Sequence, residues 1–263
     1  MKNKILTIII PTKNRFFYVK KIILEIKELI NLINIIIIDD CSGKKEREKL
    51  QSFLKNFKKI SFIQFHKNKG QSAVCNHGLK LSKSKYVWFF DDDDFVNKNT
   101  LLRIITFLSK NSPDGILLPM KQIYKKKTIR YVRPKFNEHN YEFLRNAQQK
   151  VSTSCAIFKR KNILKIKGWD VNLFGGTDTD LFLRFSKNNI FEVFYTRPII
   201  VNFAAPNRVT NNFFRQQKAK LSFLYKHWEI LTLKRKVYYI ISFILCFPLI
   251  NNFKSKLRVF YNN

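Results

Sequence analysis

The chain has 263 residues, and 50 Lys or Arg against 18 Asp or Glu give it a formal net charge of +32. With 45% hydrophobic and 15% aromatic residues it is too apolar for an intrinsically disordered protein, and seven Gly and seven Pro exclude a collagen-like or linker-dominated chain. So high a charge favours anionic partners: nucleic acid, an anionic membrane surface or phosphorylated substrates. The four cysteines are far apart, which argues against a zinc site or disulfide framework and fits a reducing compartment.

Short apolar runs alternate with helical patterns through the first 118 residues. We expect strands at residues 5–10, 35–38, 60–65, 86–90 and 116–118, and helices at 19–33, 46–57, 71–81 and 100–109. The first run is too short for a signal peptide and ends at Pro11, so we interpret it as a buried strand. Continuous β-branched runs that alternate with helices predict an α/β fold with a doubly wound, mainly parallel sheet of the Rossmann type.

The pattern changes after residue 118. A hairpin is expected at residues 122–124 and 128–132, further strands at 151–158, 192–195 and 199–203, and helices at 162–166 and 178–186. No linker interrupts residues 1–205, so we expect one domain there, with one half at about 1–118 and a smaller half at about 119–205.

Residues 206–263 form a different segment, with eleven Lys or Arg and a single acid, Glu229. Residues 237–250 are strongly apolar, and cations flank them on both sides. A membrane span needs about 20 residues, so this run is too short, and Pro248 interrupts it. The pattern predicts a helix that lies in the interface of an anionic membrane. The alternative is a core helix packed on the domain.

Eight of the ten aspartates fall into three groups: Asp39 with Asp40, the four residues 91–94, and Asp178 with Asp180. The first two groups follow predicted strands, as do residues 11–15. In a parallel sheet the carboxyl ends of the strands form the ligand site, so these segments should converge. Four consecutive aspartates favour a divalent cation, Mg²⁺ or Mn²⁺, that bridges carboxylate and substrate phosphate. The alternative is a solvated acidic turn.

The order and spacing of several motifs carry a family resemblance over about residues 5–190. The motifs are Ile8-Ile9-Ile10-Pro11-Thr12-Lys13-Asn14-Arg15, Ile36-Ile37-Ile38-Asp39-Asp40-Cys41-Ser42, Asn68-Lys69-Gly70 with Asn76 and Gly78, Phe89-Phe90-Asp91-Asp92-Asp93-Asp94, Gly168-Trp169-Asp170 and Gly176-Thr177-Asp178-Thr179-Asp180-Leu181. Together they resemble the family 2 glycosyltransferases of the GT-A fold. The resemblance implies an inverting transfer of a sugar from a nucleotide donor to an acceptor hydroxyl.

The resemblance assigns the half at 1–118 to the nucleotide sugar. The binding residues it implies are Pro11, Thr12, Asn14, Arg15, Asp40, Gly70, Asn76, Asp91 and Asp92. Asp40 would accept a hydrogen bond from the base, and a carboxylate there favours the imide N–H of uracil or thymine. Asp91 and Asp93 are the ends of a D-x-D motif that would hold Mn²⁺ or Mg²⁺ on the diphosphate.

The half at 119–205 is assigned to the acceptor. Asp178 matches the general base that would deprotonate the acceptor hydroxyl; its alternative role is a helix N-cap. We expect Asp180 to support the start of the helix rather than act on substrate. Trp169, Asp170 and Thr177 are the remaining acceptor-side candidates, and Trp169 would either stack on a sugar ring or be a buried aromatic.

Two positions depart from the family pattern. Thr177 stands where the family commonly has Glu before the base, which affects the positioning of the acceptor. Cys75 stands where it commonly has Arg before Asn76, which removes an expected support of the nucleotide site.

We therefore expect a glycosyltransferase of bacterial surface polysaccharide synthesis, a hexosyl- or related transferase. A UDP-sugar would be the donor and a glycan or lipid-linked molecule the acceptor, at the cytoplasmic face of the inner membrane and peripherally bound. A nucleotidyltransferase is the enzymatic alternative, but residues 11–15 contain no Gly for a phosphate loop. A nucleic-acid-binding protein would fit the charge, yet residues 91–94 would repel phosphate, so we expect no nucleic-acid partner.

Overall fold

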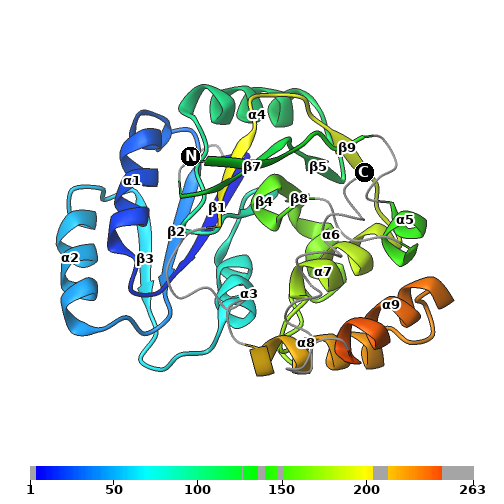
Figure 1. Cartoon of the computed structure of the whole chain (residues 1–263). Coiled ribbons are helices and arrows are strands. Elements are labelled where there is room, and N and C mark those ends of the chain that lie inside the picture. The colour runs from blue at the N-terminus through cyan, green and yellow to red at the C-terminus, as the bar shows by residue number, and fades with distance from the viewer. Residues whose placement is uncertain (1–3, 126, 136–139, 147–150, 204–212, 245–263) are drawn as a thin grey trace.

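The computed structural model describes residues 4–125, 127–135, 140–146, 151–203 and 213–244. A seven-stranded sheet in the order β3-β2-β1-β4-β8-β5-β9 forms the centre of the molecule (Figure 1). Its strands are β1 (Leu6–Thr12), β2 (Asn34–Asp39), β3 (Ile60–Gln64), β4 (Tyr86–Phe89), β5 (Gly115–Leu117), β8 (Ala156–Lys159) and β9 (Phe191–Val193). The predicted α/β class with a mainly parallel sheet is confirmed.

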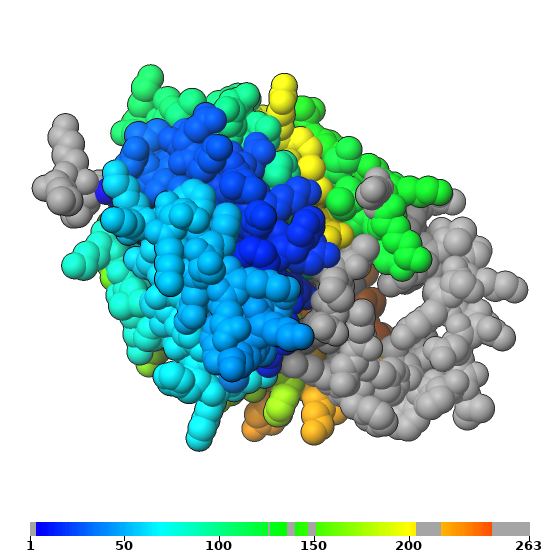
Figure 2. Space-filling view, turned by 90° about the vertical axis from the view of Figure 1, so that its left-hand side faces the viewer, coloured from blue at the N-terminus to red at the C-terminus, as the bar shows by residue number. Residues whose placement is uncertain are grey.

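Apolar β-branched residues explain the buried half of this sheet. Strand β1 pairs in parallel with β2 and with β4, and β2 pairs in parallel with β3. Residues 35–38 of β2 are all buried, as the continuous run predicted. Helices cover both faces of the sheet: α1 (Phe16–Ile26), α2 (Lys44–Leu54) and α4 (Lys98–Lys110) lie on one face, and α3 (Gln71–Leu81) lies against β1 and β2 on the other. Figure 2 shows the flank where α1, α2 and the residues around β3 form the surface.

Strand β8 begins five residues later than the strand predicted at residues 151–158. Ser152 accepts a hydrogen bond from the Ser154 amide through its hydroxyl and starts a short 3₁₀ turn, η2 (Thr153–Cys155). Strand β8 follows it and runs antiparallel between β4 and β5. The bond from Ser152 to the local backbone therefore delays the strand. Helix α6 (Arg160–Lys165) follows β8 directly.

A second, three-stranded sheet contains the predicted hairpin. Strand β6 (Met120–Tyr124) pairs antiparallel with β7 (Lys127–Val132), and β10 (Ile199–Asn202) lies parallel to β6. The Phe95 amide donates to the carbonyl of Ile200 at 2.9 Å, and the Asn202 amide donates to Asp94 at 3.1 Å. This sheet is therefore attached to the segment that follows the acidic run.

The C-terminal helices pack on the part of the chain at residues 119–205. Helix α7 (Thr177–Ser186) contacts the short helix α5 (Tyr141–Asn146), and α8 (Phe213–Lys226) pairs with α9 (Leu233–Ile244). Helix α9 begins four residues before the predicted apolar run, and residues 245–250 of that run lie outside the described part. In the described residues we find no helix whose length and apolar character would carry it through a bilayer.

Candidate active site

The carboxyl ends of β1, β2 and β4 meet at one edge of the sheet, as the sequence predicted. The Asp40 amide donates to the carbonyl of Thr12 at 2.8 Å, which joins the ends of β2 and β1. The Thr12 hydroxyl donates to Asp92 at 2.6 Å, which joins β1 to the acidic run after β4. Parallel pairing thus brings segments about 80 residues apart into direct contact.

Arg15 lies against the acidic run. Its guanidinium is 2.8 Å from a carboxylate oxygen of Asp92 and 3.5 Å from one of Asp93. Burial raises the pKa of Asp92 to about 6, although Arg15 and Thr12 favour its charged form. One guanidinium therefore does not fully offset the negative charge that the run places at the end of β4.

Asp91 has a carboxyl group with a strongly raised pKa. Its side chain accepts a hydrogen bond from the Gln71 amide nitrogen at 2.7 Å, and its backbone amide donates to the Ser154 hydroxyl at 3.0 Å. Burial raises its pKa well above the ordinary value, and the charges of Asp94, Asp93 and Asp178 raise it further. A nearby cation would relieve both effects.

This donor set fits a hard divalent ion that is shared with a substrate. Across the described ranges no three His, Cys, Asp or Glu side chains gather as a metal site, so the described protein groups alone form no complete coordination sphere. Mg²⁺ and Mn²⁺ sites in phosphate-binding enzymes commonly use one or two carboxylates and take other oxygens from phosphate and water. Asp91 and Asp93, which carry hard oxygen donors beside undercompensated charge, suit that arrangement.

Asn14 connects the loops that follow β1 and β2. It adopts a left-handed backbone with φ of 56°, which asparagine tolerates better than most residues. Its backbone amide donates to the Ser42 hydroxyl at 2.7 Å, and its side-chain oxygen accepts from the Gly43 backbone amide at 2.7 Å. Pro11 lies in β1 opposite Ile38. The predicted loop at residues 11–15 therefore belongs to the site edge.

Asp40 holds the loop before α3. Its two carboxylate oxygens accept from the amides of Lys69 at 2.7 Å and Gly70 at 2.9 Å. Gly70 has φ of +83° at the start of α3, a conformation that favours glycine. Each oxygen keeps a second lone pair. Asp40 thus orders the loop through contacts that the sequence did not predict.

Asn76 and Trp169 differ from their expected roles. The Asn76 side chain exchanges two hydrogen bonds of 2.8 Å with the backbone of Trp169, so it joins α3 to the loop before α7. The Trp169 ring is only 2% exposed and packs edge-on against Phe89, with ring centroids 5.3 Å apart. The buried alternative is therefore observed, and the ring offers no open face for a sugar.

Asp178 lies in the first turn of α7, half-buried, near the acidic run. Its carboxylate accepts a hydrogen bond from the Thr153 hydroxyl at 3.4 Å. The N-cap of α7 is Gly176, with Thr177 as the first helical residue, so the alternative role of Asp178 as N-cap is not observed. Burial raises the pKa of Asp178 above its ordinary value, which makes it a stronger base.

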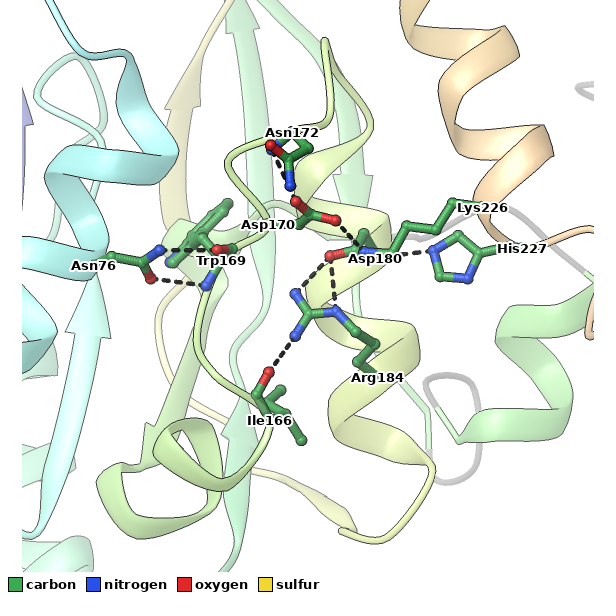
Figure 3. A network of polar contacts seen from close by, with 9 residues as sticks. All are labelled: Asn76, Ile166, Trp169, Asp170, Asn172, Asp180, Arg184, Lys226 and His227. Carbon is green, nitrogen blue, oxygen red and sulfur yellow. Dashed lines mark hydrogen bonds and ion pairs between the residues drawn. The ribbon is translucent and has the colours of Figure 1, made fainter.

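Asp180, which is itself fully buried, is the centre of an ionic network (Figure 3). One carboxylate oxygen accepts from Arg184, and the other lies 2.5 Å from the Lys226 amine and 2.9 Å from the His227 ring. Burial opposes its charge, but the hydrogen bonds from His227, Arg184 and Lys226 prevail and lower its pKa. Asp180 therefore supports α7, as expected, through residues that the sequence did not indicate.

Asp170 belongs to the same network. Its carboxylate pairs with Lys226 and also accepts from the Asn172 amide at 2.8 Å. Burial is outweighed by these bonds, so the pKa of Asp170 is lowered. The side chain predicted on the acceptor side is thus directed to α8.

The turn η2 and Cys75 lie between the two groups of acids, and sequence reasoning missed their roles. Ser154 bonds the backbone of Asp91, and Thr153 bonds Asp178. Cys75 is fully buried; desolvation, and then the charges of Asp91 and Asp178, raise the pKa of its thiol. The one available signal for η2 was a group of three small polar residues in an otherwise apolar run.

Comparisons with known proteins identify the family of the chain. The model of glycosyl transferase family 2 matches residues 7–165. An uncharacterized glycosyltransferase of Methanocaldococcus jannaschii is 23% identical over 74% of this chain and 68% of its own length. The poly(ribitol-phosphate) β-N-acetylglucosaminyltransferase TarP of Staphylococcus aureus is 28% identical over 68% of this chain and 56% of its own length. The chain thus spans little more than half of TarP.

Solved structures share the fold. S. aureus TarS 1–349 in complex with UDP-GlcNAc superposes with a TM-score of 0.67 at 16% identity, over 95% of this chain and 75% of that one. The mannosyltransferase PcManGT of Pyrobaculum calidifontis, in complex with GDP-Man and Mn²⁺, gives a TM-score of 0.63 at 14% identity, over 91% and 69%. The family match over more than half of the sequence shows that this chain is a GT-A glycosyltransferase of glycosyl transferase family 2.

Proposed function

We propose that the chain transfers a sugar from a UDP-sugar to a hydroxyl of a glycan or lipid-linked acceptor in bacterial surface polysaccharide synthesis, with inversion at the anomeric carbon. The observation that carries this proposal is the meeting of Asp91 and Asp178 around η2. The two residues lie 87 positions apart, yet the Ser154 hydroxyl accepts from the backbone amide of Asp91 and the Thr153 hydroxyl donates to the carboxylate of Asp178. An inverting transfer needs the donor site on one side of the reacting carbon and the base on the other, and two neighbouring acidic groups suit that requirement.

The strand ends form the donor side. Thr12, Asn14 and Arg15 order the first loop, while Asp40 fixes the second through Lys69 and Gly70. The free lone pairs of Asp40 suit the imide N–H of uracil. Support for a uridine donor comes from the similarity of the fold to TarS, which was solved with UDP-GlcNAc.

Asp91 and Asp93 would hold Mn²⁺ or Mg²⁺ in this proposal. A divalent ion there would offset the charge that develops on the leaving nucleoside diphosphate. Asp92 is less suited to the ion, because Thr12 and Arg15 already contact both of its oxygens.

Asp178 would act as the base on the acceptor side. Its carboxylate takes the proton of the acceptor hydroxyl while that oxygen bonds to the anomeric carbon. The bond from the anomeric carbon to the diphosphate oxygen breaks on the opposite face, and the nucleoside diphosphate leaves. A single displacement inverts the centre. The raised pKa of Asp178 favours proton uptake near neutral pH, and the Thr153 hydroxyl orients the carboxylate.

The substitution Asp178→Asn tests this assignment. We expect turnover to fall by about 10²–10⁴-fold, the usual contribution of a general base, while binding of the nucleoside diphosphate stays unchanged. The assay measures nucleoside diphosphate release across several nucleotide sugars with Mn²⁺, and titration with the diphosphate measures binding. Unchanged turnover in the variant would remove Asp178 from the mechanism.

The same assay separates the proposal from a nucleotidyltransferase. A glycosyltransferase releases nucleoside diphosphate, whereas a nucleotidyltransferase acting on a sugar phosphate releases pyrophosphate. Pyrophosphate as the product would overturn the proposed reaction.

A further inference from the structure

Helix α9 presents its apolar residues outward. Leu233, Val237, Ile240 and Ile241 follow at helical spacing and form one stripe, and all four are exposed, Leu233 by 76%. On a helix packed against a soluble domain, such a stripe normally faces the core. Tyr225, 89% exposed, and Trp228 add two exposed rings from the end of α8 and the turn after it.

The inner side of α9 is polar and aromatic. Arg235 is only 5% exposed, and its guanidinium donates to the Tyr239 hydroxyl at 3.2 Å and lies 5.0 Å from the centre of that ring. The Lys220 amine of α8 donates to the carbonyl of Ser242 at 2.8 Å. The helix is therefore fixed to α8 through its polar side. The exposed stripe is a consequence of this packing and does not reflect a loosely attached helix.

The surroundings of the stripe are basic. Residues 213–244 contain seven Lys or Arg and one acid, Glu229. Lys234 is exposed next to Leu233, and the Lys236 amine lies 4.6 Å above the centre of the Trp228 ring. Aliphatic residues with a rim of Lys and with Trp and Tyr beside them are the composition of helices that lie on anionic bilayers. A polyanion in solution would use the cations but would leave the aliphatic stripe in water.

This surface is joined to the acceptor side by short polar contacts. Lys226 and His227, at the end of α8, both bond Asp180, which lies two positions after Asp178 (Figure 3). Lys226 also pairs with Asp170, which directly follows Trp169. A partner that binds α8 and α9 would therefore lie at a fixed position relative to α7, the helix that carries Asp178.

We propose that α8 and α9 form a docking face for an anionic lipid bilayer, and that this face holds the acceptor side of the site next to the membrane. The link to the acceptor rests on the proposed function, since it takes Asp178 as the base. Binding of the face to lipid does not depend on that function.

Vesicle sedimentation of the whole chain, without donor or acceptor, tests the docking face. Vesicles with a substantial fraction of phosphatidylglycerol should bind the protein, and vesicles of phosphatidylcholine alone should bind it much more weakly. The double variant Leu233→Glu/Ile241→Glu should lower the partition coefficient for the anionic vesicles roughly tenfold or more, because two new charges would have to enter the interface. The matched control Leu24→Glu/Ile190→Glu changes two exposed apolar residues elsewhere and should bind like the wild type.

Other outcomes would overturn the proposal. Equal binding by the wild type and the Leu233→Glu/Ile241→Glu variant would remove the apolar stripe from the interaction. If the wild type binds no vesicles but sediments as a dimer that this variant dissociates, the face is a contact between two copies. Displacement from vesicles by polyphosphate, with no effect of the double variant, would indicate a site for soluble polyanions.

Turnover distinguishes this proposal from the proposed function. The double variant should keep nucleoside diphosphate release with a soluble acceptor or with water. If that release is absent from the wild type as well, the proposed function fails, while the vesicle result still decides the docking face.

Discussion

The end of β4 and the start of α7 both contain aspartates. The surroundings favour the neutral form of the carboxyl groups at β4 and the charged form of Asp180 in α7. At the end of β4 Arg15 lies against two carboxylates of the run, Asp92 and Asp93, and burial raises the pKa values of Asp91 and Asp92. At α7 three basic side chains surround Asp180 and lower its pKa. Undercompensated carboxylates attract a ligand that brings positive charge, whereas a fully paired carboxylate stabilises the fold. Asp178 lies in the first turn of α7, but its pKa is raised, so it belongs chemically with the first region.

We expect the largest effect from a substitution in the acidic run at residues 91–94. In Asp93→Asn, turnover should fall by about 10³-fold or more, because one oxygen donor for the divalent ion is lost and several kcal/mol of charge stabilisation depend on that ion. Unlike Asp178→Asn, this variant should also weaken nucleoside diphosphate binding measured with Mn²⁺. If Asp93→Asn binds the diphosphate and Mn²⁺ as well as the wild type, the two regions do not divide as we propose.

The next largest effect should come from Asp180, which is paired with basic side chains. In Asp180→Asn the free energy of unfolding should fall by about 3 kcal/mol, since a buried ion pair loses one partner. Because the pKa of Asp180 is lowered in the fold, its stabilisation is present above the ordinary value of about 4 and is lost as the pH falls below it. The difference between wild type and variant should therefore shrink in acid. Denaturant unfolding at pH 7 and below pH 4 measures both.

Asp170→Asn is the matched control for that experiment. It also removes a carboxylate partner of Lys226, but from a partly exposed position, so the loss should be within about 1 kcal/mol. Equal losses in the two variants would contradict the central role of Asp180.

A smaller effect tests the contact between α3 and the acceptor loop. Gly168 has φ of +65°, and an added Cβ would lie 2.3 Å from the side-chain oxygen of Asn76. Gly168→Ala should therefore destabilise the protein by roughly 1–3 kcal/mol and displace Trp169. Thermal unfolding measures the loss. Gly43→Ala, at a glycine with ordinary φ and an open environment, is the control and should change little.

The smallest effect should come from a change in the pKa of Asp178, the proposed base. Thr153→Val removes the hydroxyl that donates to Asp178, so the pKa of Asp178 should rise further. The base acts in its charged form, so the acidic limb of the pH–rate profile should move to higher pH, with less than about a tenfold loss at neutral pH. Thr153→Ser keeps the hydroxyl and should restore the profile. An unshifted limb in Thr153→Val would show that this hydrogen bond does not set the pKa.

The strand ends could be predicted from the sequence because the information is local. Runs such as residues 35–38 define buried strands, and parallel topology then brings their carboxyl ends together. The acidic run, Arg15 and Asp40 were placed at one edge for this reason. Their individual partners, such as Lys69 and Gly70 for Asp40, depend on loop conformations that periodicity does not describe.

The region around α7 depends on contacts between distant segments. Lys226 and His227 lie 46 and 47 positions after Asp180, and nothing in the local sequence pairs them with it. The bounds of α8 and the short helix α5 were not predicted either. Trp169 had two open roles because a single aromatic residue after a glycine does not reveal which side of a loop will be buried.

The attachment of α8 to Asp180 has a practical consequence for shortening the chain. Removing all residues from Phe213 onward would take away Lys226 and His227 and leave the buried Asp180 carboxylate, two positions from the proposed base, without these partners. A chain that ends after Thr232 would retain both and would lose the apolar stripe of α9. For crystallisation or assays in solution, the second end point should preserve the active site and the first should damage it.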